Sequence, residues 1–350
     1  MTRMPLDAVH EKMCSGLEQD MFTAAVLQVI RKGRILFHGA YGTLGGQGTP
    51  EADTQTLFDM ASVTKILATT PLWMLLESES PGIIDENLTR WFPEAPPDKS
   101  SITPRHLLAH ASGLPAWRPY YLMGSGSSHS ASVRARILSE VLAYPIGRGC
   151  IYSDLGFMLL GFMLEKETGR SLKECAREMM YEPLGLEDML FRPADRAERI
   201  ALTRFGDATG LVNDLNARAL GGVAGHAGLF ATADAAGRLA LEIMRSYLDR
   251  GFFKTSVIRR FCARPGFTAD STRALGFDTP AVEGSSCGRF FSRRSVGHTG
   301  FTGVSLWMDM EREAIGVLLT NRVVKGESDF RIKDFRPSVY DAVMSAVVDE

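Results

Sequence analysis

Strand-forming segments lie near both ends of this chain, and the long stretch between them has a helical pattern. Residues 24–30 and 34–41 are rich in β-branched and aromatic residues and flank the short loop 31–33, which predicts a hairpin. Residues 301–308 and 314–320 predict a second hairpin. We therefore expect an α/β (α+β) fold, in which one antiparallel sheet built from both termini is flanked by helices.

The helical pattern places an inserted subdomain between the two sheet-forming parts. Residues 1–75 and 222–350 are expected to form the α/β sheet domain, and residues 76–221 a mainly helical insertion. A helix is predicted to open at Ser62, and Pro71 inside it indicates a kink or a later start. Further helices are predicted over residues 103–110, 131–144, 155–168, 171–180 and 337–348.

The charge of the chain argues against a polyanionic partner. It carries 39 basic and 41 acidic residues, a net charge of −2, with no long run of either sign. Nucleic acid and anionic membranes bind to basic patches, so neither is expected as a partner. The N-terminus lacks the continuous apolar segment of a signal peptide, and no stretch of about twenty apolar residues is present. We expect a cytoplasmic protein.

The cysteines do not indicate a metal or redox site. All five are scattered, and no two have the close spacing of a zinc ligand pair. His106 and His110 have the i, i+4 spacing of a zinc-binding helix, but the companion glutamate is absent. We expect both histidines to pack and hydrogen-bond inside the helical subdomain, and His226 to satisfy backbone groups in a tight loop near the cleft. No metal or organic cofactor is expected.

Ser62 and Lys65 form a candidate nucleophile and base. Three residues apart at the start of a helix, their side chains lie on one face. A serine hydroxyl becomes a good nucleophile when a neighbouring base takes its proton, and a desolvated lysine can be that base. A chain of this length contains roughly one such spacing by chance, so the surrounding motifs must decide.

Two further motifs supply what a serine hydrolase also needs, a proton shuttle and donors for the oxyanion. Tyr152-Ser-Asp154 follows a glycine turn and precedes a helix. His298-Thr299-Gly300 directly precedes the predicted strand 301–308. The glycine would let a substrate backbone approach the edge of that strand.

With these three motifs in this order, the chain resembles the serine β-lactamase and penicillin-binding protein superfamily. It is most similar to the branch of class C β-lactamases, low-molecular-weight D,D-peptidases, D-aminopeptidases and family VIII esterases. The resemblance runs from the hairpin near residue 24 to residue 322 and includes residues 102–115, 221–230 and 318–322.

The resemblance implies a role for each motif residue. Ser62 would be the acylated nucleophile, Lys65 its activating partner and Tyr152 the relay of the proton to the leaving group. Whether Lys65 or Tyr152 is the general base stays open, because the two should titrate as a coupled unit. The backbone N–H groups of Ser62 and Phe301 would form the oxyanion hole. The implied substrate-binding residues are Asp154, His298, Thr299, Gly300 and Phe301.

Two positions depart from the family pattern. Asp154 stands where asparagine is usual, and an ionised carboxylate cannot donate a hydrogen bond to a substrate. It would pair with Lys65 and raise the pKa of that amine, or it would cap the helix that follows. His298 stands in place of lysine and supplies little positive charge. That choice resembles D-aminopeptidases and related amidases or esterases more than true β-lactamases.

These features predict a serine hydrolase that acts through an acyl-enzyme on Ser62. Its substrate would be a small-molecule ester or a peptide-like amide, and it would be an esterase, or a D-aminoacyl or cell-wall peptide amidase or peptidase. A β-lactamase or D,D-carboxypeptidase is the first alternative. A non-catalytic protein that binds peptides or peptidoglycan fragments is the second. Ester or amide preference and the oligomeric state stay open.

Overall fold

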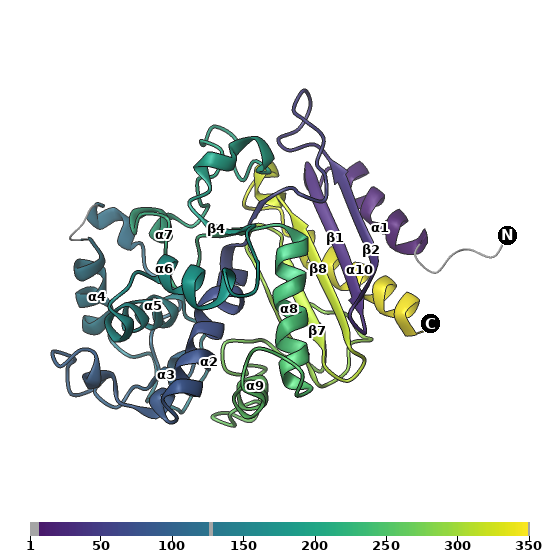
Figure 1. The fold of residues 1–350 in the computed structure, drawn as a ribbon. Coiled ribbons are helices and arrows are strands. Elements are labelled where there is room, and N and C mark those ends of the chain that lie inside the picture. Colours follow the sequence, from purple (N-terminus) through teal and green to yellow (C-terminus); the bar gives the residue numbers. More distant parts are fainter. Residues whose placement is uncertain (1–6, 126–128, 349–350) are drawn as a thin grey trace.

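The computed structural model describes residues 7–125 and 129–348, and its centre is a five-stranded antiparallel sheet (Figure 1). The strand order is β2-β1-β8-β7-β6. The strands are β1 (Ala24–Arg31), β2 (Arg34–Gly42), β6 (Ser295–Thr299), β7 (Ser305–Asp309) and β8 (Ala314–Thr320). Strand β1 pairs with β8 from Ala25 opposite Thr320 to Arg31 opposite Ala314. The predicted sheet from both termini is therefore confirmed.

The second predicted hairpin is wrong at its first strand. Residues 300–304 form a turn, closed by a bond from the Gly300 N–H to the Val304 carbonyl (2.8 Å), and the strand begins only at Ser305. His298 and Thr299 were predicted to precede a strand, but they lie on a separate strand, β6. The segment Ser-Val-Gly-His-Thr is short and has a glycine at its centre, which weakens its local preference for a strand.

Helices cover both faces of the sheet (Figure 1). Helices α1 (Asp7–Glu18) and α10 (Ile332–Val348) lie against one face, where Leu27 and Val29 are buried. Helix α8 (Ala233–Tyr247) lies against the other, where Val26 and Ile30 are buried. Because both faces of β1 are covered, its sequence is apolar from Ala24 to Ile30 except for the buried Gln28.

The remaining helices and a small second sheet lie beside the main sheet. These helices are α2 (Thr70–Glu79), α3 (Pro104–Leu108), α4 (His129–Ser139), α5 (Asp154–Thr168), α6 (Leu172–Ala176), α7 (Leu215–Ala219) and α9 (Thr255–Cys262). The small sheet has the order β3-β5-β4, with β3 (Phe58–Asp59), β4 (Met189–Phe191) and β5 (Leu229–Ala231). It pairs strands from both predicted regions, whose boundaries at 75/76 and 221/222 stay a prediction.

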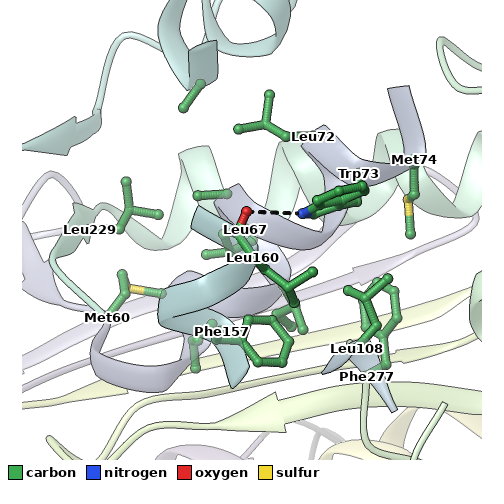
Figure 2. Close-up of a cluster of buried hydrophobic side chains, with 14 of the residues drawn as sticks. Met60, Leu67, Leu72, Trp73, Met74, Leu108, Phe157, Leu160, Leu229 and Phe277 are labelled. Atoms are coloured by element: carbon green, nitrogen blue, oxygen red, sulfur yellow. Dashed lines mark hydrogen bonds between the residues drawn. The ribbon is translucent and has the colours of Figure 1, made fainter. Parts of the chain in front are cut away.

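Helices α2 and α5 meet at Trp73 (Figure 2). The indole is fully buried, its Nε1–H donates to the Leu160 carbonyl (3.3 Å), and its edge meets Trp91 with ring centroids 5.8 Å apart. A buried indole needs a partner for its N–H, so this contact fixes the orientation of the ring. It also sets the position of the segment that carries Ser62 relative to the helix that begins at Asp154.

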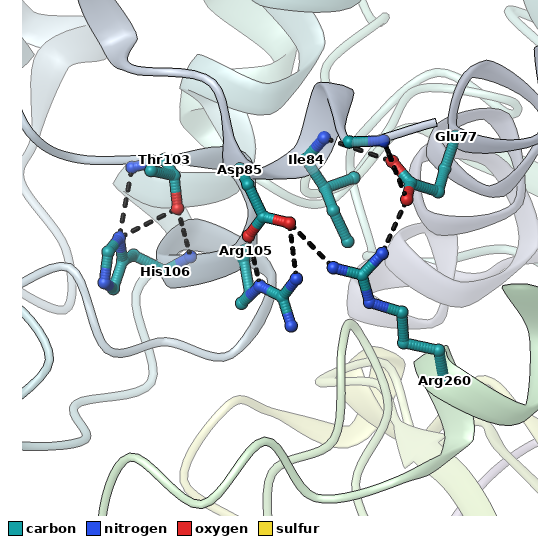
Figure 3. A network of polar contacts seen from close by, with 8 residues as sticks. Glu77, Ile84, Asp85, Thr103, Arg105, His106 and Arg260 are labelled. Carbon is teal, nitrogen blue, oxygen red and sulfur yellow. Dashed lines mark hydrogen bonds and ion pairs between the residues drawn. The ribbon is translucent and has the colours of Figure 1, made fainter. Parts of the chain in front are cut away.

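An ionic network links α9 to α2 and α3 (Figure 3). The Arg260 guanidinium contacts the carboxylates of Glu77 (2.6 Å) and Asp85 (2.7 Å), and Arg105 forms a forked pair with Asp85. Glu77 is buried, and its carboxylate also accepts hydrogen bonds from the backbone N–H groups of Gly82 and Ile84. Its charge is therefore compensated on two sides.

Among the described residues, none of the helices has the length and apolar character needed to cross a lipid bilayer.

Candidate active site

Ser62 lies on a composite helical segment. A 3₁₀ turn (Ala61–Val63) leads into a π-helical turn (Lys65–Thr69) and then into α2, so the single helix predicted from Ser62 is wrong and the later start is right. Ala61 has a φ of +43°, and its N–H donates to Asp59 Oδ1 (2.8 Å). A non-glycine residue in this region stores strain. Here that strain is held directly before the candidate nucleophile.

Lys65 is fully buried, and its ammonium group makes three polar contacts. Nζ lies 3.0 Å from Ser62 Oγ, 2.7 Å from Asp154 Oδ1 and 3.1 Å from the carbonyl oxygen of His226. Burial alone would lower the pKa of Lys65. The Asp154 carboxylate and then Tyr152 outweigh it, so the pKa stands above its ordinary value. Lys65 is therefore a charged donor to Ser62 in the resting protein.

Asp154 pairs with Lys65 and does not cap helix α5. The cap is Ser153, whose hydroxyl oxygen accepts from the Gly156 N–H (3.3 Å). Asp154 is the first residue of α5, and its side chain is 18% exposed. Of the two alternatives left open by the sequence, the ion pair is the one present.

Tyr152 lies over the same ammonium group. Lys65 Nζ is 4.9 Å from the centroid of the phenol ring, and Arg273 Cζ is 5.0 Å from it. The hydroxyl is buried beside Lys65 and Ser62. Burial raises the pKa of Tyr152, and the attraction of Lys65 offsets only part of that rise. The phenol is therefore neutral in the resting protein.

Two neutral histidines flank the Tyr152 ring. The centroid of His110 lies 4.6 Å from it and that of His298 5.7 Å. Burial, helped by nearby Arg273 and Lys65, holds the pKa of each histidine well below its usual range. This agrees with the sequence expectation that position 298 carries little positive charge.

The hydrogen bonds of these histidines fix their tautomers. The His298 ring donates from Nδ1 to the Thr299 carbonyl (2.7 Å), because a carbonyl only accepts. Its Nε2 is then an acceptor, buried and without a partner in the described chain. His110 Nδ1 accepts from the Ser153 N–H (3.0 Å), so its proton is on Nε2. His110 thus belongs to the candidate site, a position that its helical spacing with His106 did not indicate.

His106 and His226 have local structural partners. The His106 side chain completes a capping box with Thr103 at the start of α3 (Figure 3). The His226 side chain contacts Asp214 (Nε2 to Oδ1, 2.9 Å) and does not satisfy backbone groups, so that expectation is wrong. Burial would raise the pKa of Asp214, but His226 and a backbone N–H lower it to about 2. No group of metal-ligating side chains occurs among the residues that the structure describes.

Gly300 allows β6 to approach the segment that carries Ser62. A β-carbon at this position would lie 2.9 Å from the Met60 carbonyl oxygen and 2.6 Å from Val304 Cγ2. Both separations are shorter than van der Waals contact, so any side chain would push the two segments apart. The close neighbour of this glycine is therefore the protein's own backbone. The sequence-based prediction was that a substrate backbone would approach the strand edge at this glycine.

A cavity of about 760 Å³ opens at these residues. Its lining includes all the predicted site residues except Lys65, which is buried behind Ser62. It also includes Arg322, which ends the motif at residues 318–322, and three arginines that no motif indicated, Arg204, Arg273 and Arg336. These three are brought together only by the fold. The volume is in the range of pockets that hold small organic ligands.

Comparison with known proteins shows which family the chain belongs to. The model of the beta-lactamase family matches residues 10–340. An N-acetylmuramyl-L-alanine amidase of Bacillus subtilis is 30% identical, and the match covers 97% of this chain and 88% of that protein.

Two solved structures share the fold at low sequence identity. EstCE1, described as a hydrolase with promiscuous acyltransferase activity, has a TM-score of 0.79 at 21% identity and covers 97% of this chain and 98% of its own. A penicillin-binding protein homologue from Caulobacter crescentus has a TM-score of 0.76 at 18% identity, with the same two coverages. The chain belongs to the beta-lactamase family and is a serine hydrolase that acts on esters or amides.

Proposed function

We propose that the protein is a serine amidase that cleaves an amide bond in peptides derived from the bacterial cell wall, through an acyl-enzyme on Ser62. The observation that carries the proposal is the contact between Lys65 Nζ and Ser62 Oγ (3.0 Å) at the floor of the cavity. A serine, a buried lysine and a buried phenol in contact are what acyl transfer requires. A protein that only binds peptides has no need of them.

The base in this proposal is the Lys65–Tyr152 pair after it has lost one proton. In the resting state Lys65 is charged and Tyr152 neutral, so neither accepts a proton from Ser62. Loss of one proton gives either a neutral amine or a phenolate beside the ammonium, and the pair has one apparent pKa for that step. Asp154 raises it, because its negative charge favours retention of the proton.

Acylation then follows from the geometry of the three side chains. The base takes the Ser62 proton while Oγ bonds to the substrate carbonyl carbon, and the carbonyl oxygen becomes an oxyanion facing the Ser62 and Phe301 N–H groups. The C–N bond breaks as Tyr152 passes the proton to the leaving amine. Water attacks the acyl-serine by the reverse sequence and releases the acid.

The position of Arg273 favours a substrate that carries a negative charge. Its guanidinium lies over the Tyr152 ring, and its carboxylate contact is Asp278 at 3.6 Å, too long for a hydrogen bond. Its donors therefore stay available for a substrate carboxylate, and a guanidinium fork suits that group. Arg273 would supply the positive charge that His298 does not, and cell-wall peptides carry free carboxylates.

The leading candidate bond is the one between an N-acetylmuramyl group and L-alanine. The amidase of Bacillus subtilis is named for that bond and matches this chain over nearly its full length. A second candidate is the terminal peptide bond cleaved by a D,D-carboxypeptidase. It is favoured by Arg273, which would hold the C-terminal carboxylate. The predicted cytoplasmic location stays a prediction that cell fractionation would test.

Intact-mass analysis with a fluorophosphonate tests the nucleophile. We expect one adduct on the wild-type protein, none on Ser62→Ala, and an unchanged adduct on Ser78→Ala, a control on the same helical segment. Turnover of a muramyl peptide, a peptide ending in D-alanyl-D-alanine, a p-nitrophenyl ester and a chromogenic cephalosporin then ranks the substrates. Turnover by folded Ser62→Ala would refute the mechanism. Ligand binding without adduct or turnover would favour the non-catalytic alternative.

A further inference from the structure

Arg336 on α10 is a buried cation without a carboxylate partner. The residue is 7% exposed, and no ion pair joins it to an acidic group in the described part of the chain. Burial lowers its pKa to about 10, which still leaves the guanidinium charged at neutral pH. Buried charges are usually paired because desolvation is costly. The position of this unpaired charge, in the lining of the cavity, therefore calls for an explanation.

The Arg336 donors are directed at one turn. Nη2 donates to the carbonyl oxygens of Gly300 and Val304, and Nε donates to that of Gly303 (3.3 Å). The Gly300 carbonyl and the Phe301 N–H are the two ends of a single peptide group. That N–H donates to no acceptor among the described residues, and it is the second oxyanion donor in the proposed mechanism.

A charged donor on a carbonyl strengthens the N–H at the other end of the same peptide. It draws electron density toward the oxygen, which makes the nitrogen's proton more positive, and hydrogen bonds in a chain reinforce one another in this way. The contact also fixes the plane of the peptide, so the N–H keeps its direction while charge develops on the substrate. Such preorganised donors lower the barrier because they need no rearrangement.

We propose that Arg336 is a positioning residue that orients and polarises the Gly300–Phe301 peptide and so strengthens the oxyanion hole. The inference rests on the proposed function, because it takes the Phe301 N–H as an oxyanion donor. It assigns to α10, at the far end of the chain, a part in stabilising the transition state. The stabilisation would appear when the carbonyl oxygen becomes negative and would be nearly absent in the bound substrate.

Arg322, which follows β8 and contacts the same turn, is a matched control. It is also buried, at 3% exposure, and its Nε donates to the Phe301 carbonyl (2.9 Å). That carbonyl belongs to the next peptide, between Phe301 and Thr302, and does not polarise the Phe301 N–H. Replacing Arg322 removes support from the turn and leaves the Gly300–Phe301 peptide with its charged partner. The pair of variants therefore separates polarisation from general support.

The kinetic test compares Arg336→Gln, Arg336→Lys and Arg322→Lys. For each we would measure kcat, KM and the inhibition constant of a boronic acid, whose tetrahedral adduct on Ser62 places an oxygen in the oxyanion hole. In Arg336→Gln, kcat and boronic-acid affinity should fall together by about ten- to a hundredfold, below the loss for a whole oxyanion donor. KM should change less than threefold, because the interaction is made in the transition state.

Arg336→Lys keeps the charge, so its kcat and its boronic-acid affinity should fall less than those of Arg336→Gln. Arg322→Lys should leave the ratio of boronic-acid affinity to KM within threefold of the wild type. A boronic-acid affinity that stays unchanged in Arg336→Gln, or the same ratio change in the Arg322 variant, would overturn the inference. Thermal melting of every variant checks that the fold is kept.

A spectroscopic measurement tests the contact without relying on activity. With glycine labelled at the carbonyl carbon and phenylalanine at nitrogen, the Gly300–Phe301 peptide gives one of a small set of coupled signals. Its carbonyl shift should move upfield in both Arg336 variants and stay in place in Arg322→Lys. An unmoved signal refutes the polarisation. A wild-type protein without a serine adduct refutes the proposed function, whereas an active protein with unchanged kcat in Arg336→Gln refutes this inference alone.

Discussion

Replacing Asp154 by asparagine should move the pH–rate profile toward acid. Asp154 raises the pKa of both Lys65 and Tyr152, so its loss lowers the apparent pKa of the pair, whichever of the two is the base. The acid limb of kcat/KM reports the pH at which the pair loses its proton. That limb should therefore appear at lower pH in Asp154→Asn.

The size of the shift follows from the geometry of the ion pair. Unit charges 2.7 Å apart attract by about 6 kcal/mol at an effective dielectric constant of about 20. Asp154 is partly open to solvent, so the effective shift should be about 1–3 pKa units, which is the usual range for a close opposite charge. The carboxamide has the same shape as the carboxylate and keeps an acceptor for the lysine, so the variant changes charge more than packing.

The assay is kcat/KM from pH 5 to pH 10 with the best substrate of the panel. Asp278→Asn is the control, because Asp278 also lines the cavity but does not contact Lys65. We expect its acid limb within about 0.3 pH unit of the wild type. An acid limb that is equally unmoved in folded Asp154→Asn would refute the coupling between Asp154 and the base.

Three further predictions concern the scaffold of the site. Gly300→Ala should lower kcat by about a hundredfold with a small change in KM, because its β-carbon displaces the Phe301 N–H; steady-state kinetics would contradict this if kcat stayed within threefold. Trp73→Leu should reduce the free energy of unfolding by about 3 kcal/mol, measured in urea, because it opens a buried cavity and removes the indole hydrogen bond to the Leu160 carbonyl; a loss below about 1 kcal/mol would contradict this expectation. Burial raises the pKa of Asp59 to about 6 from 3.8, so its contribution favours folding below pH 4 and is lost as pH rises to 6, by about 3 kcal/mol. Asp59→Asn should remove that part of the pH dependence of unfolding in urea, and an identical dependence in both proteins would show that Asp59 does not cause it.

Local sequence preference was sufficient to predict a strand or helix where the tertiary structure agrees with that preference. Strands β1 and β8 are mostly apolar because both faces of the sheet are covered, and the sequence predicted both. Strand β6 was missed, because Gly297 and His298 have little strand preference and are held there by pairing with β7. The segment at Ser62 was predicted as one helix, but it consists of a 3₁₀ turn, a π-helical turn and α2.

The candidate site was predictable to the extent that its residues sit in short motifs. Ser62, Tyr152 and His298 were found through their motifs, whereas the pairing of Asp154 with Lys65 was one of two alternatives that only the structure could separate. Arg273 and Arg336 were not found, because an arginine in an irregular segment or on a helix has no signal of its own. Their roles depend on which carbonyls and rings the fold brings within reach, and this is set by contacts between distant parts of the chain.

The pairing of β1 with β8 has a consequence for synthesis of the protein on the ribosome. The β1–β2 hairpin emerges early, but the partner on the other side of β1 begins only at Ala314. During the synthesis of nearly three hundred residues, the nascent chain therefore exposes an apolar strand edge that invites wrong pairing, and this high contact order predicts slow folding. Ser62 is made early, whereas Phe301 and Arg336 arrive last. In the proposed mechanism, an incomplete chain accordingly has a serine without its oxyanion hole, and reactivity would begin only after the central sheet has closed.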